Sequence, residues 1–507
     1  MIPLRLAEIA LITGGRVFNG TDPIDPGAGS PGPDPLVNGP VVTDSREAAP
    51  GSLYVARVGE AMDGHVFVAA ARAHGAVAAL TSRPVPELPC VVVEDVQAAF
   101  AALARALLER HPEVVVVAVT GSSGKTSTKD LLLSVLGRHG ETVANIGSLN
   151  GEVGVPLTVC RIADTTAFLV LEMGARAIGH IDYLTQMAPP QIGVVLNVGT
   201  AHVGEFGSRE AIGTAKAELV QALPATGFAV LNADDPIVAA MAGKTRAHVI
   251  RVGESPHATV RAVDISLDGH GCASFTIVTD QGRAPVSLGL HGEHHVGNAL
   301  AVAAVALSVG MSLPDVATAL GEARPLSRWR MEVHERADGV TIVNDAYNAN
   351  PDSMLAALKA LAVMGEGRRT WAVLGEMREL GEQSTSDHEV LGRLAVRLGV
   401  SRVVAVGERT QPIERGAREE DARHQDSAPQ DSGHKDSGHK NSGHKDSGRD
   451  VAIWVPDTDA AHELLQQQLA PGDVVLLKSS RDAGLRWLGD RLVNDGPVDN
   501  DGSEVHS

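Results

Sequence analysis

The sequence predicts an α/β protein made of three successive domains. The chain has 507 residues, which is more than one hydrophobic core usually organises. Short apolar runs rich in β-branched residues also alternate with amphipathic helical stretches along most of its length. This alternation is typical of mostly parallel sheets covered by helices. Changes in the pattern place the predicted domains at residues 1–108, 109–325 and 326–492.

The first predicted domain is a small α/β unit with short strands and apolar helices. Glycine and proline are concentrated at residues 20–40, and this composition favours turns over strands or helices. We therefore predict a mobile loop at 20–40 within an otherwise self-contained domain.

Two doubly wound sheets are predicted in the rest of the chain. The second domain has strand-like runs at 114–119, 167–172, 192–198 and 228–233. The third has such runs at 340–345, 370–376, 402–408 and 473–480. Helical stretches alternate with the runs in both domains, which favours helices on both faces of each sheet.

A five-residue repeat interrupts the third domain. The segment 416–450 contains no apolar residue after Pro429. Such a segment buries too little surface to offset the entropy lost on ordering, so we predict a disordered insertion there. The same argument predicts a disordered tail at 493–507.

Composition excludes several classes of function. The chain has 62 acidic and 43 basic side chains, and its net charge of -19 disfavours nucleic acids and anionic membranes as partners. Its three cysteines are far apart and lack metal-ligand spacing, which favours a reducing compartment over a disulfide framework. No signal peptide or membrane-spanning run is found in the sequence. We expect a cytoplasmic protein without membrane insertion.

A glycine loop follows the first strand of the second domain. The candidate phosphate-binding residues form one segment: Thr120, Gly121, Ser122, Ser123, Gly124, Lys125, Thr126 and Ser127. Backbone N–H groups of such a loop hold phosphates, while Lys125 would neutralise them and the Thr126 hydroxyl would bind Mg²⁺. An ordinary glycine turn before a helix is the alternative, and the strand-loop-helix order argues against it.

Two further candidate metal ligands follow neighbouring strands. Glu172 closes the run 167–172, and His202 lies in the loop after the run 192–198. The carboxyl ends of parallel strands share one edge of a sheet, so both side chains and Thr126 are predicted to converge. Taken singly, a helix-capping carboxylate and a loop histidine are alternatives.

Lys216 lies on an apolar helical stripe. The stripe comprises Ile212, Lys216, Leu219, Val220 and Leu223. A lysine in this position can extend its amine to solvent. Alternatively, burial lowers the pKa of the amine, which then acts in its neutral form. The pattern alone leaves both interpretations open.

The start of the third domain carries an arginine and a carboxylate. Arg330 precedes the first strand, and Asp345 ends it. An arginine from a neighbouring domain can stabilise a transferring phosphoryl group, and a strand-end carboxylate can bind a ribose or orient a metal-bound water. Two ordinary surface charges are the alternative.

Motifs along nearly the whole chain resemble those of the Mur ligase family. In order, they are TGSSGKTS, LEMGARAIGHI, LNVGTAHVGEFGSREAIGTAKAEL, LNADDP, HGEHHVGNAL, RWRMEV, NDAYNANPDSM, LGEMRELGE and PGDVVLLKSSR. Within the family, EMGA, NDAYNANPDSM and GEMRELGE are similar to the members that add D-alanyl-D-alanine to UDP-N-acetylmuramoyl-tripeptide. The resemblance implies a UDP-sugar domain, a central ATPase domain and a C-terminal Rossmann-like domain.

The resemblance also implies an activity and its partners. ATP and Mg²⁺ would activate the tripeptide carboxylate as an acyl phosphate, and the amine of D-alanyl-D-alanine would displace phosphate. The chain would be an ADP-forming ligase of peptidoglycan precursor synthesis and a monomer.

Site residues are implied position by position. The resemblance implies catalytic roles for Lys125, His202, Lys216 and Arg330, with Lys216 carbamylated by CO₂ to give a metal ligand. It implies that Asn298 contacts adenine, that Arg330 and Asp345 contact ATP, and that the segment Asp44, Ser45, Arg46 lies near the UDP-sugar. Thr126, Glu172 and His202 would complete the metal ligands.

The sequence departs from the family pattern at two places. Family members often have two asparagines where this chain has Asn150-Gly151, and a glycine where it has Ser479. These positions concern substrate and dipeptide contacts, whereas the ATP-binding residues match throughout.

Two other classes of function are alternatives to this ligase. A sibling ligase that adds a single amino acid, or a folate-type glutamate ligase, is disfavoured because those relatives differ at NDAYNANPDSM. A nucleotide-binding regulatory protein without catalysis is disfavoured because loss of activity would have removed at least one of the candidate residues.

Overall fold

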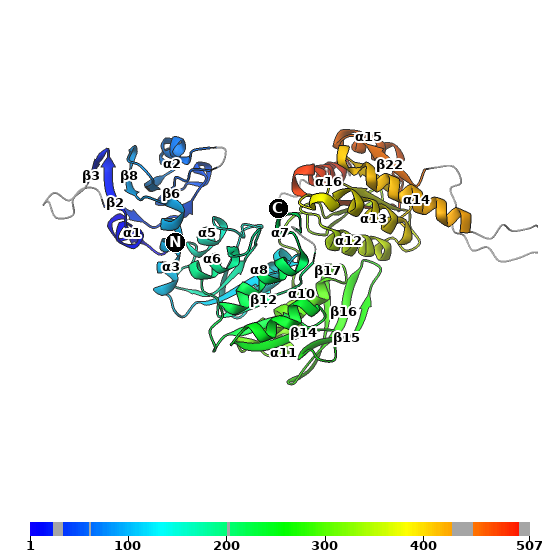
Figure 1. Cartoon of the computed structure of the whole chain (residues 1–507), viewed down its shortest axis with the longest axis horizontal. Helices are drawn as coiled ribbons and strands as arrows, with labels where there is room; N and C mark the ends of the chain where they lie inside the picture. The colour runs from blue at the N-terminus through cyan, green and yellow to red at the C-terminus, as the bar shows by residue number, and fades with distance from the viewer. Residues whose placement is uncertain (24–33, 60–61, 200–202, 428–449, 496–507) are drawn as a thin grey trace, which may run out of the picture.

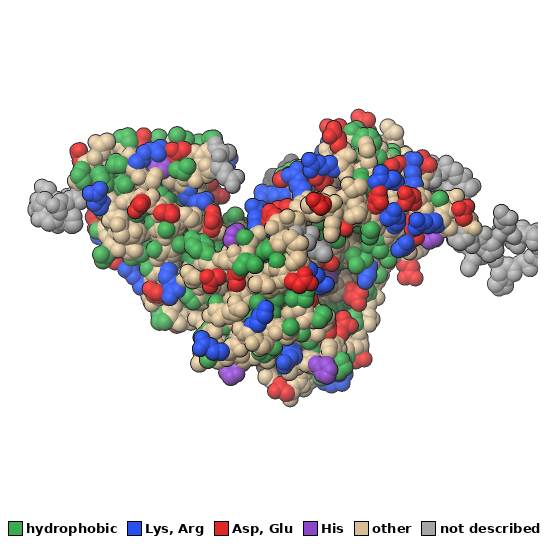
Figure 2. Space-filling view, viewed as in Figure 1, with side chains coloured by type: hydrophobic (Ala, Val, Ile, Leu, Met, Phe, Trp, Pro, Cys, Tyr) green, Lys and Arg blue, Asp and Glu red, His purple; other side chains and the backbone are tan. Residues whose placement is uncertain are grey.

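The structure is a computed structural model that describes residues 1–23, 34–59, 62–199, 203–427 and 450–495. Within these ranges the chain forms three bodies in sequence order, each built on its own large sheet (Figure 1). The predicted α/β fold class with three domains is confirmed. Figure 2 shows a hollow between the first and third bodies, above the central one.

The first body contains a six-stranded sheet in the order β3-β2-β8-β7-β6-β5. Its strands are β2 (Arg16–Gly20), β3 (Asp22–Pro23), β5 (Val41–Val42), β6 (Ser52–Val55), β7 (Ala76–Thr81) and β8 (Val85–Val92). Strands β1 (Leu4–Arg5) and β4 (Leu36–Val37) pair separately. The helices are α1 (Leu6–Thr13), α2 (Val68–Ala73) and α3 (Val96–Glu109), with 3₁₀ turns η1 (Ser45–Glu47) and η2 (Gly64–Phe67).

The central body has a nine-stranded sheet in the order β10-β11-β9-β12-β13-β14-β15-β16-β17. The strands are β9 (Val115–Thr120), β10 (Glu141–Ala144), β11 (Thr166–Glu172), β12 (Ile192–Val195), β13 (Phe228–Asn232), β14 (His248–Gly253), β15 (Val260–Leu267), β16 (Cys272–Thr279) and β17 (Gly282–His291). Pairing is parallel from β10 to β15 and antiparallel from β15 to β17.

Helices cover both faces of the central sheet. They are α4 (Lys125–Leu136), α5 (Gly154–Val159), α6 (His180–Met187), α7 (Val203–Phe206), α8 (Arg209–Gln221), α9 (Pro236–Ala240), η3 (Met241–Lys244), α10 (His295–Ser308) and α11 (Leu313–Glu322). One hydrophobic core extends from α1 and α3 through α5 and α6 to the sheet. The first body is therefore joined to the central one through a shared apolar interior.

The third body contains a six-stranded sheet in the order β18-β19-β23-β20-β21-β22. Its strands are β18 (Glu332–Glu335), β19 (Thr341–Asn344), β20 (Thr370–Leu374), β21 (Arg402–Val406), β22 (Ala452–Val455) and β23 (Val474–Lys478). Only β18 is antiparallel to its neighbour. The helices are α12 (Pro351–Met364), α13 (Ser384–Arg397), α14 (Gln411–Ser427), α15 (Thr458–Gln468) and α16 (Leu485–Asn494), with 3₁₀ turns η4 (Gly381–Gln383), η5 (Glu408–Thr410) and η6 (Arg481–Ala483).

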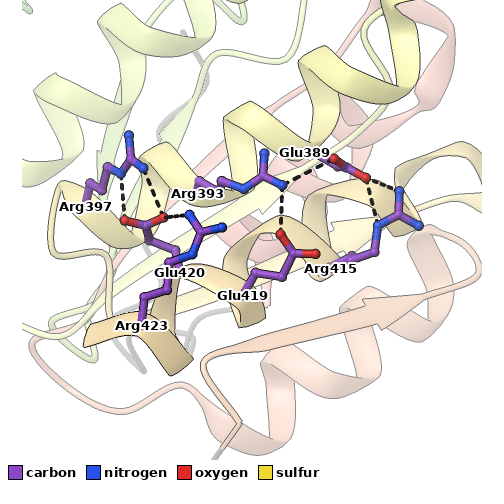
Figure 3. A network of polar contacts seen from close by, with 7 residues as sticks. All are labelled: Glu389, Arg393, Arg397, Arg415, Glu419, Glu420 and Arg423. Atoms are coloured by element: carbon purple, nitrogen blue, oxygen red, sulfur yellow. Dashed lines mark hydrogen bonds and ion pairs between the residues drawn. The ribbon is translucent and has the colours of Figure 1, made fainter. Parts of the chain in front are cut away.

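The structure corrects part of the predicted insertion. Residues 416–427 belong to α14, whereas disorder was predicted from 416 onward. Figure 3 shows why this polar sequence forms a helix: its charged side chains pair with those of α13. Glu420, for example, accepts hydrogen bonds from Arg397 at 2.7 and 3.1 Å. Residues 428–449, where the repeat lies, fall outside the described residues.

Two other predicted irregular segments are partly regular. The loop predicted at 20–40 includes residues of β3 and β4, while 24–33 lie outside the described ranges. The predicted tail begins within α16, which continues to Asn494. None of the helices in the described part of the chain combines the length and hydropathy that a membrane-spanning segment requires.

The connection between the central and third bodies has an unusual backbone. Trp329 and Met331 have φ angles of 59° and 51°, in the left-handed region that non-glycine residues rarely adopt. The Trp329 indole N–H donates to Asp490 at 3.1 Å, and the Met331 N–H donates to Asp345 at 3.1 Å. Packing against the third body therefore holds this connection in place.

Candidate active site

A cavity of about 850 Å³ lies between the central and third bodies. The predicted site residues that line it are Ser122, Ser123, Gly124, Lys125, Thr126, Ser127, Glu172, Lys216, Asn298, Arg330 and Asp345. Most of them lie at or after the carboxyl ends of parallel strands, where α/β sheets bind ligands. The structure therefore brings most of the predicted site together.

The glycine loop lies between β9 and α4, as predicted. The Asn197 side-chain oxygen accepts hydrogen bonds from the N–H groups of Ser122 and Ser123, both at 2.9 Å. Gly124 has a φ of 80°, and a Cβ there would lie 2.7 Å from the Asn298 side-chain oxygen. The position thus requires glycine for both conformation and space. The loop is shaped by contacts from two other segments.

Lys125 begins α4 and lies in the cavity. Its amine donates to the carbonyl of Gly121 at 2.8 Å. Burial lowers the pKa of Lys125, while nearby Glu172 opposes this effect and Arg330 reinforces it. An anionic ligand in the cavity would favour the charged form of this lysine. Thr120 is fully buried at the end of β9 and does not line the cavity.

Thr126 and Glu172 form the centre of the site. The Thr126 hydroxyl donates to a Glu172 carboxylate oxygen at 2.8 Å, and the Asn150 amide donates to the other oxygen at 2.6 Å. Glu172 is 1% exposed. Buried carboxylate and hydroxyl oxygens side by side are ligands that Mg²⁺ prefers, so this pair fits a magnesium ion.

The rest of the predicted metal site is described only in part. His202 lies outside the described residues. Within the described ranges, no group of three or more His, Cys, Asp or Glu side chains is arranged to hold a metal ion. The Thr126 hydroxyl and the Glu172 carboxylate are therefore the candidate ligands whose contact the structure describes.

Lys216 is buried on α8 and lines the cavity. Burial lowers its pKa well below the usual lysine value, and the nearby positive charge of Lys125 adds to the effect. No hydrogen bond or ion pair to its amine is found among the described residues. Of the two interpretations left open by the sequence, the structure favours the buried, neutral amine.

The third body contributes Arg330 and Asp345. The Arg330 guanidinium donates to the hydroxyls of Thr126 at 3.2 Å and Ser148 at 3.0 Å, and lies 4.3 Å from the centre of the Tyr347 ring. Asp345 is paired with the Lys478 amine at 2.6 Å. The predicted arginine from the neighbouring domain therefore reaches the glycine-loop helix directly.

Asn298 lies on the buried helix α10 at the other side of the glycine loop. Its amide nitrogen is 3.5 Å from Nδ1 of His295, whose pKa burial lowers well below the usual histidine value. A neutral histidine and an amide offer both donors and acceptors, which suits the edge of a nucleobase.

The segment Asp44, Ser45, Arg46 does not join this cavity. It forms η1 in the first body, where the Asp44 carboxylate accepts from the backbone and side chain of Arg46. These hydrogen bonds lower the pKa of Asp44 to about 2. Any role of these residues concerns a part of a substrate that lies away from the phosphate loop.

Several cavity residues were missed by the sequence-based reasoning. They are Ser148, Asn197, Tyr347 and Lys478, and also Asn150, which the sequence marks only as part of a departure from the family pattern. Each contacts a predicted residue, but none stands at a spacing that marks it in advance. The polar loop that follows β10 is the one sequence feature that could have indicated Ser148 and Asn150.

A phosphate loop, a buried oxygen pair and an arginine from a second domain define an ATP-dependent enzyme. The chain belongs to the Mur ligase family. Three descriptions of that family match successive parts: "Mur ligase family, catalytic domain" at residues 40–117, "Mur ligase middle domain" at 119–306 and "Mur ligase, glutamate ligase domain" at 329–481. The predicted family is therefore confirmed.

Individual relatives agree with this assignment. The UDP-N-acetylmuramoyl-tripeptide--D-alanyl-D-alanine ligase of Mycobacterium tuberculosis is 47% identical over 98% of each chain. The Escherichia coli enzyme of the same name is 37% identical over 74% of this chain and 82% of its own. The crystal structure of MurF from Acinetobacter baumannii has a TM-score of 0.82 and 29% identity over 97% of this chain and 99% of that one. The crystal structure of MurF from Thermotoga maritima in complex with ADP has a TM-score of 0.74 and 27% identity, over 90% of this chain and 97% of that one.

Proposed function

We propose that this protein joins D-alanyl-D-alanine to UDP-N-acetylmuramoyl-tripeptide while ATP is converted to ADP and phosphate, a cytoplasmic step of peptidoglycan precursor synthesis. The observation that carries the proposal is the contact of Thr126 with Glu172 beside Lys125, completed by Arg330 from the third body. Relatives of this name match the chain over nearly its whole length.

Each body takes one part of the reaction. Residues 1–108 bind the UDP-sugar, with Asp44, Ser45 and Arg46 near it. Residues 109–325 bind ATP, and residues 326–492 close the cavity and present the dipeptide. We propose that the active protein is a monomer.

The ATP phosphates lie along Gly121 to Ser127, with adenine near Asn298. Loop N–H groups and the Lys125 amine bind the phosphate oxygens, and Asp345 faces the nucleotide from the third body. Thr126 and Glu172 would hold Mg²⁺, which would supply charge neutralisation during phosphoryl transfer. Arg330 adds a second positive charge beside the same residues.

The chemistry needs two displacements. An oxygen of the tripeptide carboxylate attacks the γ-phosphorus of ATP, the bond to the β-phosphate oxygen breaks, and ADP leaves. The dipeptide amine then attacks the carbonyl carbon of the acyl phosphate; an amide forms, phosphate departs and the amine loses a proton. The cavity favours both steps by fixing the partners and stabilising negative charge.

Lys216 takes part as a carbamate in this proposal. Only a neutral amine attacks CO₂, and burial keeps the pKa of this amine low. Carbamylation would convert this neutral amine into an anion that could contribute oxygen to the metal site, together with His202. The proximity of Lys125 further favours an anion at this position.

Product analysis tests the function. We would incubate the protein with ATP, Mg²⁺ and UDP-N-acetylmuramoyl-tripeptide, adding D-alanyl-D-alanine, D-alanine, an L-amino acid or no amine, and measure phosphate and product mass. Phosphate and a UDP-pentapeptide that appear only with the dipeptide support the proposal. Turnover with a single amino acid would instead identify a sibling ligase, and no turnover with any amine would favour a regulatory role.

A further inference from the structure

A loop of the third body contacts α7 of the central body. The loop, residues 375–383, joins β20 to α13 and carries Glu379 at the edge of the cavity. The Glu379 carbonyl accepts a hydrogen bond from the N–H of Gly204 at 3.1 Å. A Cβ on Gly204 would lie 2.7 Å from the backbone nitrogen of Gly381, so the two backbones are in close contact.

The same loop is joined to the cavity-lining segment 478–481. The N–H of Ser480 donates to the Glu376 carbonyl at 3.0 Å, and the N–H of Arg378 donates to the Ser480 hydroxyl at 2.9 Å. Lys478, which pairs with Asp345, and Arg481 both line the cavity. A shift of the loop would therefore displace cavity residues as well as the contact with the central body.

His388 of α13 is hydrogen-bonded to this loop. The side chain is 0% exposed in the second turn of α13. Its Nε2 accepts a hydrogen bond from the N–H of Met377 at 2.9 Å, and its Nδ1 lies 2.6 Å from the Ser384 carbonyl. A backbone N–H is always a donor, so Nε2 carries no proton and Nδ1 donates to Ser384. Both nitrogens have fixed roles that only the neutral ring fulfils.

The helix that carries His388 is itself held by α14. Figure 3 shows Glu389, the next residue, between Arg393 and Arg415. The Arg415 Nε–H donates to Glu389 at 2.8 Å. These contacts fix α13 on its outer side, so the imidazole links a well-supported helix to the loop.

We propose that His388 is a positioning residue for the ligase reaction: it fixes the loop 375–383, and with it the seating of the third domain on the central domain. This inference rests on the proposed function for its kinetic consequence. It goes beyond that function because His388 does not line the cavity and acts only through Met377 and the loop.

Two substitutions at His388 test the proposal. His388→Phe keeps a ring but removes both hydrogen bonds, whereas His388→Gln retains an oxygen acceptor for the Met377 N–H. We expect kcat of the Phe variant to fall between about tenfold and a hundredfold because misplaced cavity groups slow the reaction. ATP affinity should change less than kcat, since the glycine loop that binds the phosphates belongs to the central body, and the Gln variant should recover part of kcat.

A second variant approaches the same contact from the central body. Gly204→Ala places a methyl group against Gly381, and we expect the same loss of kcat with a smaller change in ATP affinity. Gly243→Ala, where a Cβ meets nothing within 4 Å, is the matched control. His462→Gln removes a buried histidine of α15 that is paired with Asp495, outside the cavity, and controls for loss of a buried imidazole.

Hydrogen exchange separates this inference from the proposed function. In His388→Phe, amides of 376–383 and 203–207 should exchange faster, while the control variants keep wild-type protection. This result is expected even if the amine substrate is not D-alanyl-D-alanine. Wild-type exchange at both segments in a folded Phe variant, or equal kcat values for the Phe and Gln variants, would overturn the proposal; if the Phe variant does not fold, wild-type kcat in Gly204→Ala would do so.

Discussion

Thr126 and Glu172 are 46 positions apart in the sequence, yet the hydroxyl of one donates to the carboxylate of the other at 2.8 Å. They meet because α4 begins beside the carboxyl end of β9, and β11, which ends at Glu172, pairs with β9 in parallel. The contact places an oxygen pair where the glycine loop presents its backbone N–H groups.

Glu172→Gln should abolish most activity by removing the charge of this oxygen pair while keeping its size. We expect the rate of phosphate release to fall by on the order of 100-fold or more and the Mg²⁺ requirement to rise. A magnesium titration of the reaction measures both. Glu141→Gln, at the opposite end of the neighbouring strand, is the control, and an unchanged magnesium response in Glu172→Gln would contradict the assignment.

Lys216→Ala should be inactive, and added bicarbonate should not restore it because no amine remains to be carbamylated. A small carboxylic acid should restore part of the activity by occupying the vacated space. Carbon NMR with labelled bicarbonate should show a carbamate signal in the wild type and in Lys244→Ala but not in Lys216→Ala. Full activity of Lys216→Ala would exclude the carbamate role.

The ring of Tyr347 should matter more than its hydroxyl. Arg330 lies over this ring, and a partly buried cation–π contact contributes about 1–2 kcal/mol. Tyr347→Leu should therefore lower kcat roughly tenfold, whereas Tyr347→Phe should remain close to wild type. Steady-state kinetics of the pair decide the matter; equal losses in both variants would assign the effect to the hydroxyl instead.

His388 should make the stability of the protein depend on pH. Burial lowers its pKa below the ordinary 6.5 in the folded protein, against smaller opposing effects of Ser384, Glu376 and Asp387. Below about pH 6.5 His388 binds a proton in the unfolded chain but not in the folded one. The free energy of unfolding therefore decreases as the pH decreases, until the pKa of the folded state is reached. The neutral His388 ring therefore contributes its full stabilisation above about pH 6.5.

Thermal unfolding of the wild type and His388→Gln from pH 8 to pH 5 checks this dependence. All other titrating groups are common to the two proteins, so the difference in melting temperature isolates His388. We expect the wild type to lose its advantage as the pH falls. A difference that stays constant over the whole range would show that the imidazole does not titrate against folding.

Two deletions distinguish the contribution of α14 to stability from that of the repeat that follows it. Removing 428–449 should leave turnover near wild type. Removing 418–448 also deletes Glu419 and Glu420, whose ion pairs with Arg393 and Arg397 join α14 to α13. This larger deletion should lower the melting temperature by a few degrees, and equal melting temperatures would mean that these pairs contribute nothing.

The strands and the glycine loop could be predicted because local patterns determine them. The run ending at Thr120 is buried on both faces of the sheet, so it reads as continuously apolar. Gly124 and Lys125 then mark a turn and a helix start with their own conformational requirements. Glu172 and Arg330 were found because strand ends and domain junctions are known places for ligands.

Other parts of the site depend on packing between distant segments. Ser148 bonds to Arg330, 182 positions away, and Lys478 bonds to Asp345, 133 positions away. Neither contact leaves a spacing in the sequence: the first arises where two domains meet, and the second arises where β19 and β23 of the third domain pair. Residues 416–427 were predicted wrongly for the same reason: composition reports the helix's own polarity but not the arginines of α13 that pair with it.

Arg330 is flanked by the two left-handed residues, Trp329 and Met331, and both are tied to the third domain. The arginine therefore travels with that domain as a fixed part of it, although its guanidinium bonds to the hydroxyl of Thr126 in the central one. A rotation of the third domain about the chain before Trp329 would withdraw this positive charge from the glycine loop. We therefore expect ATP hydrolysis to be slow while the domains are apart, because the arginine reaches the glycine loop only when the two domains are together.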